Sequence, residues 1–303
     1  MPELPDIEVY VDRLRSLVVG QTLLNTRVVS PSLVQSVDPP LSAAYDRKCV
    51  SAQRLGKRII LGFEDDLFCV LHLMIAGRLR WKKPQFTVPR KRGLAAFYFK
   101  HGTLLLTEAS AKKRATLHMA DGIDALAPFN RGGLEVLGST CDAFAEALTR
   151  ENRTLKRALT DPRLISGIGN AYSDEIMHRA RLSPMQRTKN LSPATIERLH
   201  QVTQDVLQEW MDRLQAAAGE SFPDRVTAFQ SDMAVHGKYR DPCPVCSTPV
   251  QRVKYAQNEC NYCPGCQTEG RLLSDRSLSR LLRDDWPKTY EALEAHMDAR
   301  RTS

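Results

Sequence analysis

The sequence predicts a multidomain α+β protein with an N-terminal β-sandwich, a helical middle region and a small cysteine-rich unit near the C-terminus. Three observations support this prediction. Short apolar runs separated by turn residues fill the first 135 residues, helical periodicity begins at about residue 136, and five of the eight cysteines lie between 243 and 266. The 303 residues are enough for about two domains of ordinary size.

The first region, 1–135, alternates apolar runs with Gly, Pro and Asp, as in "FEDD" and "KHGT". Short strands at this spacing are typical of a β-sandwich or barrel. The runs that we expect to be strands are 59–61, 67–73, 95–99 and 103–106. A leading helix is expected at about 6–18, because its apolar residues, Ile7, Val11, Leu14 and Val18, are spaced to share one helical face.

From 136 to 230 the apolar spacing favours helices. "CDAFAEALTREN" predicts one helix, and "SPATIERLHQVTQDVLQEWMDRLQAAAG" predicts a longer one. Ser192 can cap the longer helix, Pro193 suits its first turn, and Gly219 can end it. The cysteine-rich unit then occupies 231–273, and a basic extension at 274–303 is expected to be helical.

The chain is basic, with a formal net charge of +8 and a sequence pI of about 9.1. Its basic residues cluster in two stretches, 82–92 and 112–114. Such clusters favour a polyanionic partner, most often nucleic acid, although charge alone fits a solvated loop equally well. No apolar run reaches membrane-spanning length, and the acidic, proline-bearing start does not resemble a signal peptide. We therefore expect an intracellular protein without membrane association.

Cys243-Pro-Val-Cys246 and Cys263-Pro-Gly-Cys266 form two C-x2-C knuckles separated by sixteen residues, and the sequence between them predicts two strands and a turn. Such knuckles supply the four soft ligands that tetrahedral zinc prefers. Cys260 forms a competing C-x2-C-x2-C pattern with Cys263 and Cys266. An iron–sulfur cluster would need a fourth cysteine followed by proline close downstream, and none follows. We therefore predict a zinc ribbon that the metal holds together, with Cys260 as a spare thiol.

The segment "SGIGNAYSDEIMHRA" places Gly167 and Gly169 between two helical stretches, with Asn170 at the start of the second. Glycines let the backbone approach a ligand closely, and the N–H groups at a helix start can bind a phosphate. In isolation the pattern favours a simple helix–helix turn. Beside a basic surface and a zinc ribbon, it becomes a candidate DNA-contacting element.

The chain begins Met-Pro-Glu-Leu-Pro, and methionine before proline is usually removed. Pro2 would then carry a free secondary amine beside the carboxylate of Glu3. An α-amine has a pKa near ~8, so that a useful fraction is unprotonated at neutral pH. By itself this pair predicts only an ordinary chain end.

Four features together resemble the formamidopyrimidine-DNA glycosylase / endonuclease VIII family. They are the Pro-Glu-Leu-Pro start, "LGKRI" with Lys57, the "GIGN" turn and the C-terminal ribbon, in the family's order over about 2–270. The resemblance implies a helix–two-turn–helix element in the helical domain, with DNA in the cleft between the domains. It also implies a bifunctional DNA glycosylase with abasic-site lyase activity.

The resemblance assigns roles to several residues. Pro2 becomes the nucleophile that attacks C1′ of a damaged nucleotide, and Glu3 the proton shuttle. Lys57, His72 and Asn170 would grip phosphates around the extruded nucleotide. His72, in "VLHLM", fits a core histidine equally well.

The chain departs from the family pattern at four places. Asn258 stands near the position of the arginine that many members carry at the tip of the zinc hairpin. The gap-filling Asp-Pro-Arg-Arg-Phe segment is replaced by "TEASAKKRATLH". The wedge methionine aligns with Ile75, although Met74 is adjacent, and an apolar wedge survives either way. The segment 219–237 is shorter than the base-capping region of the 8-oxoguanine enzymes.

We therefore expect a monomeric repair enzyme that acts on damaged double-stranded DNA in the bacterial cytoplasm, associated with the nucleoid. Oxidised purines and oxidised pyrimidines both stay open as substrates, and the short capping segment slightly favours pyrimidines or a broader set. One alternative is a protein of the same fold that binds damaged DNA without cutting it. Another is a zinc-ribbon protein that binds RNA or a protein partner, which would leave the Pro-Glu start unexplained.

Overall fold

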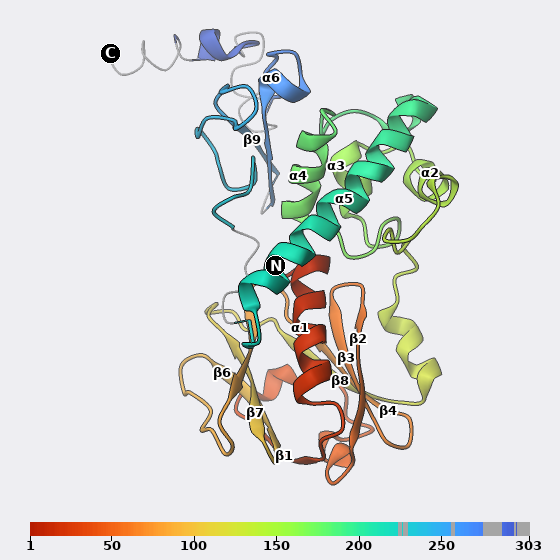
Figure 1. Cartoon of the computed structure of the whole chain (residues 1–303), viewed down its shortest axis with the longest axis vertical. Helices are drawn as coiled ribbons and strands as arrows, with labels where there is room; N and C mark the ends of the chain where they lie inside the picture. Colours follow the sequence, from red (N-terminus) through yellow and green to blue (C-terminus); the bar gives the residue numbers. More distant parts are fainter. Residues whose placement is uncertain (224–225, 227–229, 256–257, 275–286, 294, 296–303) are drawn as a thin grey trace. The chain divides into compact units, whose positions relative to one another are not determined.

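The computed structural model describes residues 1–223, 226, 230–255, 258–274, 287–293 and 295. The chain divides into two compact units (Figure 1). The sandwich unit comprises 1–132 and 208–228, and the helical–ribbon unit comprises 133–207 and 229–303. The sequence suggests domain boundaries near residues 135, 230 and 273, and these boundaries remain predictions.

Two antiparallel four-stranded sheets form the β-sandwich of the sandwich unit. The first sheet has the strand order β1-β6-β7-β5, and the second has the order β2-β3-β4-β8. The first contains β1 (Leu23–Val28), β6 (Gly93–Phe99), β7 (Gly102–Glu108) and β5 (Gly77–Lys82). The second contains β2 (Cys49–Leu55), β3 (Arg58–Phe63), β4 (Leu67–His72) and β8 (Thr116–Asp121). The predicted β-sandwich is confirmed.

The leading helix α1 (Leu4–Leu17) contributes one face to the main core, as its periodicity predicts. Fully buried Ile7, Tyr10 and Leu14 join Leu61 of one sheet and Phe97 of the other in a single hydrophobic cluster. Burying each such side chain stabilises the fold by roughly 1.5–3 kcal/mol. The core therefore fixes the position of α1 and of the chain start.

Short segments cover the outer faces of both sheets. The 3-10 helix η3 (Ile123–Phe129) packs Leu126 and Phe129 against Ile60 and Phe68 of the second sheet. On the first sheet, Phe86 and Val88 of the β5–β6 loop pack against its two central strands, β6 and β7. Two further 3-10 helices, η1 (Pro31–Leu33) and η2 (Leu41–Ala44), lie between β1 and β2.

The helical–ribbon unit begins with the predicted helices. Its elements are α2 (Cys141–Thr149), α3 (Leu155–Thr160), α4 (Asn170–Arg179), η4 (Thr188–Asn190) and α5 (Pro193–Ala218), which continues into the sandwich unit. Ser192 Oγ accepts the N–H of Thr195 at 3.3 Å, so it caps α5 as predicted. Gly219 adopts φ +53° and ends the helix, a conformation that glycine adopts without strain.

The cysteine-rich segment forms the predicted hairpin, in which β9 (Gln251–Tyr255) pairs antiparallel with β10 (Asn258–Tyr262). The short helix α6 (Pro264–Gln267) follows, and α4 contacts both β10 and α6. The predicted helix at 274–303 falls mostly outside the described residues. Within the part of the chain that is described, no helix has the length and apolarity needed to cross a membrane.

Candidate active site and metal centre

The chain start is buried at the beginning of α1. Pro2 and Glu3 are both buried, and Glu3 is 1% exposed. The helix begins at Leu4 because Glu3 has an extended backbone and forms a capping box with Asp6, in which the Glu3 N–H donates to Asp6 Oδ2 at 2.8 Å. Pro5 fits the first turn, where its missing N–H would have no helical partner. The helix start therefore fixes the Pro2–Glu3 pair.

Charged groups from three elements surround the chain terminus. Burial lowers the pKa of the Met1 amino group, and the charges of Arg78 and Lys57 lower it further, against the opposing effect of Glu3. Lys57 lies in the β2–β3 turn and Arg78 in β5. The sandwich unit thus brings the predicted Lys57 within electrostatic reach of the chain start, together with Arg78, which the sequence prediction missed.

Asp6 is a buried acid that the sequence prediction also missed. Its side chain is fully buried, and among the described residues Oδ1 has no hydrogen-bond partner. Burial raises the pKa of Asp6 to about 7, and the hydrogen bond from Glu3 opposes this rise. Its carboxyl group is therefore partly protonated at neutral pH. The spacing of a capping box, an acid three residues after Glu3, could have identified it.

Replacing Asp6 with Asn should flatten the pH dependence of stability. The folded-state pKa of about 7 lies above the usual value of 3.8, so the folded state binds more protons than the unfolded state between these values. The free energy of unfolding of the wild type should therefore fall by roughly 4 kcal/mol as pH rises from 4 to 8 because of this group. Urea denaturation at both pH values checks this. Asp12→Asn, an exposed position on α1, is the control, and an equal pH dependence of wild type and Asp6→Asn would contradict the prediction.

Lys57, Arg58 and His72 lie at one end of the second sheet. Lys57 follows Gly56 in the turn between β2 and β3, and Arg58 pairs with His72 across β3 and β4. Burial lowers the pKa of His72 to about 4, with help from the positive charges of Arg58, Lys57 and Arg131. His72 is only half-buried and is neutral at physiological pH, so it can bind a phosphate by hydrogen bonding rather than by charge.

Ile75 is the exposed tip of the tight turn between β4 and β5. Its side chain is 57% exposed, whereas Met74 is half-buried with φ +52°. The Gly77 N–H donates a hydrogen bond to Leu73 O at 2.9 Å and closes the turn. A Cβ on Gly77 would lie only 2.2 Å from the same oxygen, so no larger residue fits there. Arg78 donates to the carbonyls of Ile75 at 3.2 Å and Gly77 at 2.7 Å. Of the two apolar candidates, Ile75 has the geometry of a wedge.

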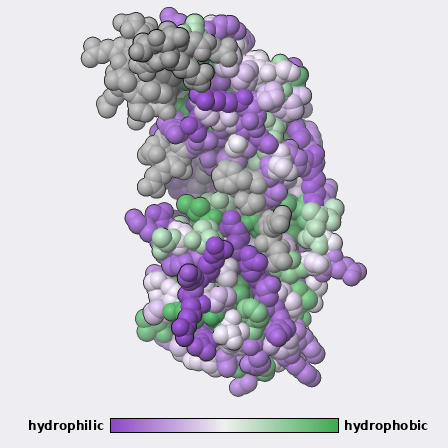
Figure 2. Space-filling model, turned by 90° about the vertical axis from the view of Figure 1, so that its left-hand side faces the viewer, coloured by the Kyte–Doolittle hydropathy of each residue, from purple (hydrophilic) through white to green (hydrophobic). Residues whose placement is uncertain are grey.

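The two basic clusters lie on loops of the sandwich unit. The β5–β6 loop carries exposed Lys83 and the exposed run 90–92, held by the buried Val88. In the β7–β8 loop, the carboxylate of buried Glu108 accepts the N–H groups of Arg114 at 2.9 Å and Ala115 at 3.1 Å. Figure 2 shows hydrophilic residues over much of one face, with apolar ones in small separate groups. These ordered loops present positive charge to solvent.

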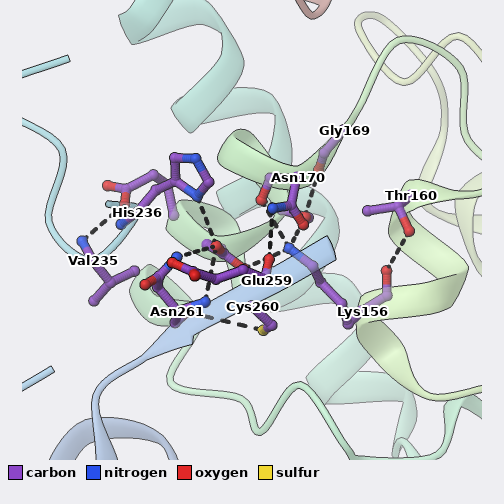
Figure 3. A network of polar contacts seen from close by, with 12 residues as sticks. Lys156, Thr160, Gly169, Asn170, Val235, His236, Glu259, Cys260 and Asn261 are labelled. Atoms are coloured by element: carbon purple, nitrogen blue, oxygen red, sulfur yellow. Dashed lines mark hydrogen bonds and ion pairs between the residues drawn. The ribbon is translucent and has the colours of Figure 1, made fainter. Parts of the chain in front are cut away.

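The glycine turn precedes α4 as predicted. Gly167 adopts φ +78°, which requires glycine, and Gly169 is the N-cap. Asn170 Nδ2 donates to Glu259 O of β10 at 2.5 Å, and Asn170 O accepts from Lys156 Nζ at 2.8 Å (Figure 3). In this structure Asn170 therefore joins the glycine turn to the β9–β10 hairpin. The side chain of Asn258, the other predicted DNA contact here, lies outside the described part of the chain.

A buried charged network holds α3, α4 and β10 together (Figure 3). Asp174 is fully buried, and its Oδ1 accepts from Lys156 Nζ at 2.5 Å. Its Oδ2 accepts from His236 Nδ1 at 2.8 Å and from the Asn261 N–H at 3.0 Å. Burial opposes ionisation of Asp174, but Lys156 and His236 outweigh it and lower the pKa. The next residue, Glu175, accepts the N–H groups of 234–236 at 2.8 to 2.9 Å.

The two knuckles bring their four sulfur atoms together. Cys246 Sγ lies 3.3 Å from Cys263 Sγ and 3.4 Å from Cys266 Sγ, and Cys243 Sγ lies 3.9 Å from Cys266 Sγ. Sulfur ligands of one tetrahedral zinc lie about 3.8 Å apart, so this donor set fits the metal. A Cβ on Gly265 would lie 2.6 Å from Thr248 Oγ1 and 3.1 Å from Cys246 Sγ, so any larger residue there would push against the first knuckle.

Cys260 lies apart from this group of sulfur atoms. It is fully buried on β10, and burial raises the pKa of its thiol well above the ordinary value. Among the described residues, the potential ligands that lie within 4.8 Å of one another are His178, Cys243, Cys263 and Cys266, a set that leaves out Cys260 and also Cys246. These observations agree with the predicted role of Cys260 as a spare thiol.

The chain start, the glycine turn and the cysteine knuckles occur in a chain that matches two known family domains. The formamidopyrimidine-DNA glycosylase N-terminal domain matches residues 1–118, and the H2TH domain of the same enzyme matches residues 136–219. The formamidopyrimidine-DNA glycosylase of Thermus thermophilus is 31% identical over 276 residues, which cover 89% of this chain and 100% of the relative. The chain belongs to the formamidopyrimidine-DNA glycosylase family. The predicted family is thereby confirmed.

Other members of the family match over different lengths. The Symbiobacterium thermophilum formamidopyrimidine-DNA glycosylase is 30% identical over 296 residues, covering 91% of this chain and 93% of the relative. A Mycobacterium tuberculosis protein described as an uncharacterized formamidopyrimidine-DNA glycosylase-like protein is 38% identical over 151 residues, covering 50% of this chain and 94% of its own length.

Solved structures of the family share the fold. MutM in complex with DNA containing carbocyclic 8-oxo-G matches with a TM-score of 0.77 and 25% identity, over 88% of this chain and 100% of that one. Lactococcus lactis Fpg in complex with DNA containing an oxidized pyrimidine matches with a TM-score of 0.78 and 25% identity, over the same shares. The predicted fold class of sandwich, helical domain and ribbon is confirmed.

Proposed function

We propose that this chain is a bifunctional DNA glycosylase and abasic-site lyase that excises oxidised bases through the amine of Pro2 once Met1 is removed. The observation that supports this most strongly is the buried Pro2–Glu3 pair at the start of α1, with Lys57 and Arg78 within electrostatic reach of the chain terminus. The relatives are named as glycosylases of formamidopyrimidine DNA, and the matching structures contain damaged DNA.

The pair supplies the two groups that the reaction needs. The Pro2 nitrogen attacks C1′, the bond from C1′ to the base breaks, and the base leaves with the electron pair and with the proton that the Pro2 nitrogen gives up. Glu3 protonates the sugar oxygen as the ring opens, which leaves an iminium ion between C1′ and nitrogen. The iminium ion needs no protonation to accept electrons, so loss of a proton from C2′ expels the 3′ phosphate. Burial lowers the pKa of the Met1 amino group, and we expect the burial of Pro2 to favour the unprotonated form of its amine in the same way once Met1 is removed.

The remaining candidate residues support a grip on an extruded nucleotide. Lys57 and neutral His72 lie at the same sheet end and fit adjacent phosphates, and exposed Ile75 fits the gap that the base leaves. In the other unit, we propose Asn170 and Asn258 as DNA contacts. Because most of these contacts are to the backbone, binding should weaken steeply with salt.

We further propose that zinc occupies the ribbon, bound by Cys243, Cys246, Cys263 and Cys266. The donor set is soft and tetrahedral in spacing, and the metal would supply structural cohesion only. The local hydrophobic cluster contains only Val235 and Val250 apart from cysteines among the described residues, which is too little apolar area to hold a hairpin.

Removing the metal with a chelator should unfold the hairpin and spare the sandwich. Structural zinc contributes about 10 kcal/mol or more to small domains, so the amides of β9 and β10 should lose hydrogen-exchange protection. The amides of β6 and β7 serve as the internal control and should keep theirs. Re-addition of zinc, but not of magnesium, should restore the protection. Unchanged protection of β9 and β10 in metal-free protein would contradict a structural metal.

A protein that binds damage without cutting it is the second candidate, favoured by Asn258 in place of the finger arginine and by the altered β7–β8 loop. Borohydride trapping and strand cleavage on duplexes with one abasic site, one 8-oxoguanine or one oxidised pyrimidine separate the two. A covalent adduct and a nick on abasic DNA support the lyase, and the other duplexes rank the bases. Specific binding with neither adduct nor nick, on protein whose mass lacks Met1, supports the alternative.

A further inference from the structure

His178 is a buried histidine that the proposed chemistry does not use. It lies in the last turn of α4 and is 5% exposed. Its Nε2 lies 3.3 Å from Cys243 Sγ, although 65 residues separate the two in sequence. Nε2 and the sulfur atoms of Cys243, Cys263 and Cys266 all lie within 4.8 Å of one another. The ring nitrogen therefore faces the metal centre directly.

The region offers five donor groups where a tetrahedral ion needs four, and the set that lies within 4.8 Å of one another contains His178 but not Cys246. The hairpin knuckles already supply four sulfur atoms, with Cys246 Sγ only 3.3 Å from Cys263 Sγ. His178 comes instead from α4, an element that packs against β10 and α6. With four thiolates bound to the metal, the histidine is left outside the coordination shell but in contact with one ligand.

We propose that His178 Nε2–H donates a hydrogen bond to the metal-bound thiolate of Cys243. This inference rests on the proposed zinc site. A metal-bound thiolate carries no proton, so a lone pair on Nε2 at 3.3 Å would face a negative sulfur atom. The favourable arrangement places the imidazole proton on Nε2, and the hydrogen bond withdraws charge from the sulfur.

Two properties follow from this hydrogen bond. Four thiolates give the zinc site a net charge of −2, two of them on the buried Cys243 and Cys263, and a donor to one buried sulfur lowers the cost of that charge. The same bond makes the Cys243 thiolate a weaker nucleophile and ties the ribbon to α4. His178 is thus a positioning residue for the metal centre, and its loss should weaken zinc binding about 10- to 100-fold.

Four proteins test the proposal: wild type, His178→Phe, His178→Gln and the control His101→Phe, which removes an exposed histidine of the sandwich unit. Zinc content is measured first, then zinc affinity by chelator competition, then zinc release during alkylation of thiols. His178→Phe, which keeps the ring but lacks a donor, should bind zinc about 10- to 100-fold more weakly and release it faster. His178→Gln, which keeps an N–H donor, should recover most of the affinity, and the control should match wild type.

Cobalt substitution distinguishes a hydrogen-bond donor from a ligand. The intensity of the thiolate-to-cobalt charge-transfer bands and the position of the ligand-field bands should be the same in wild type and His178→Phe, as expected for four sulfur ligands in both. A shift of the ligand-field bands in His178→Phe would show that the histidine binds the metal itself and would overturn the proposal. Equal zinc affinity of wild type and His178→Phe would overturn it as well.

A measurement on unaltered protein covers the case in which His178→Phe fails to fold. In cadmium-substituted wild type labelled with nitrogen-15 in histidine, the His178 ring should show the Nε2–H tautomer and a scalar coupling between the metal and Hε2. The Nδ1–H tautomer would overturn the proposal while leaving the zinc site intact. Wild type purified without zinc and unable to bind it would instead refute the zinc site on which the inference rests.

Discussion

A chain that retains a residue before Pro2 should lose strand cleavage by a factor on the order of 10⁴ or more. A peptide bond at the Pro2 nitrogen removes its lone pair and its proton-accepting capacity, so no iminium ion can form with C1′. Inserting a bulky residue between Met1 and Pro2 keeps both residues on the chain, and mass spectrometry verifies this. Borohydride trapping on a duplex with one abasic site measures the adduct, and gel analysis measures the nick.

Two matched variants separate the nucleophile from its surroundings. Pro2→Gly leaves a primary amine, whose imine must be protonated before elimination, so it should cleave more slowly but still form an adduct. Glu3→Gln keeps the amine, so on abasic DNA it should form an adduct while losing most base excision. Each variant should still bind abasic DNA at wild-type affinity within a few-fold.

The outcome of the blocked chain decides between the two candidate functions. An adduct that survives the block would place the nucleophile on another amine and contradict the assignment of Pro2. A wild type that forms no adduct, although its mass lacks Met1, would make the buried Pro2–Glu3 pair a structural element of a binding protein.

The strands that the sequence revealed are those at the centre of each sheet. β3, β4, β6 and β7 are continuous apolar runs because η3 and the β5–β6 loop cover their outer faces. The sequence prediction missed the edge strands β1, β2, β5 and β8, which are only partly buried and carry charged residues, as in "GRLRWK" of β5. Edge strands with charged side chains resist pairing with other chains, and the same property removes the apolar signal from the sequence.

The residues of the candidate sites also fall into those that the sequence identified and those that it did not. The Pro2–Glu3 start and the cysteine knuckles were found because their partners are neighbours along the chain. His178 and Cys243, or Lys156 and Asp174, are brought together only by the packing of α3, α4 and the ribbon. No local pattern encodes such contacts, since they depend on which helix face meets which strand.

Replacing Lys156 with Met should destabilise the helical–ribbon unit by about 3–5 kcal/mol. The substitution leaves the Asp174 carboxylate buried and removes the donor at 2.5 Å from its Oδ1. It also leaves Asn170 O without its 2.8 Å partner at the glycine turn. The backbone amides of α4 and β10 should therefore lose hydrogen-exchange protection, while those of β6 and β7 should keep theirs. Arg163→Met, which removes an exposed arginine that pairs with Asp161 in the same unit, is the control and should change protection much less.

The double variant Lys156→Met with Asp174→Leu distinguishes an unpaired charge from lost packing. If the cost of Lys156→Met arises from the stranded carboxylate, removing that carboxylate as well should recover part of the stability. His236 and the Asn261 N–H would still lose their acceptor, so the recovery should be incomplete. Additive losses in the double variant would instead mean that the pair contributes through packing alone. Lys156 Nζ donates to Asn170 O, and the side chain of Asn170 donates to β10. Lys156→Met should therefore also weaken DNA binding. The chemistry of Pro2 should not change, so adduct formation at saturating DNA should be preserved.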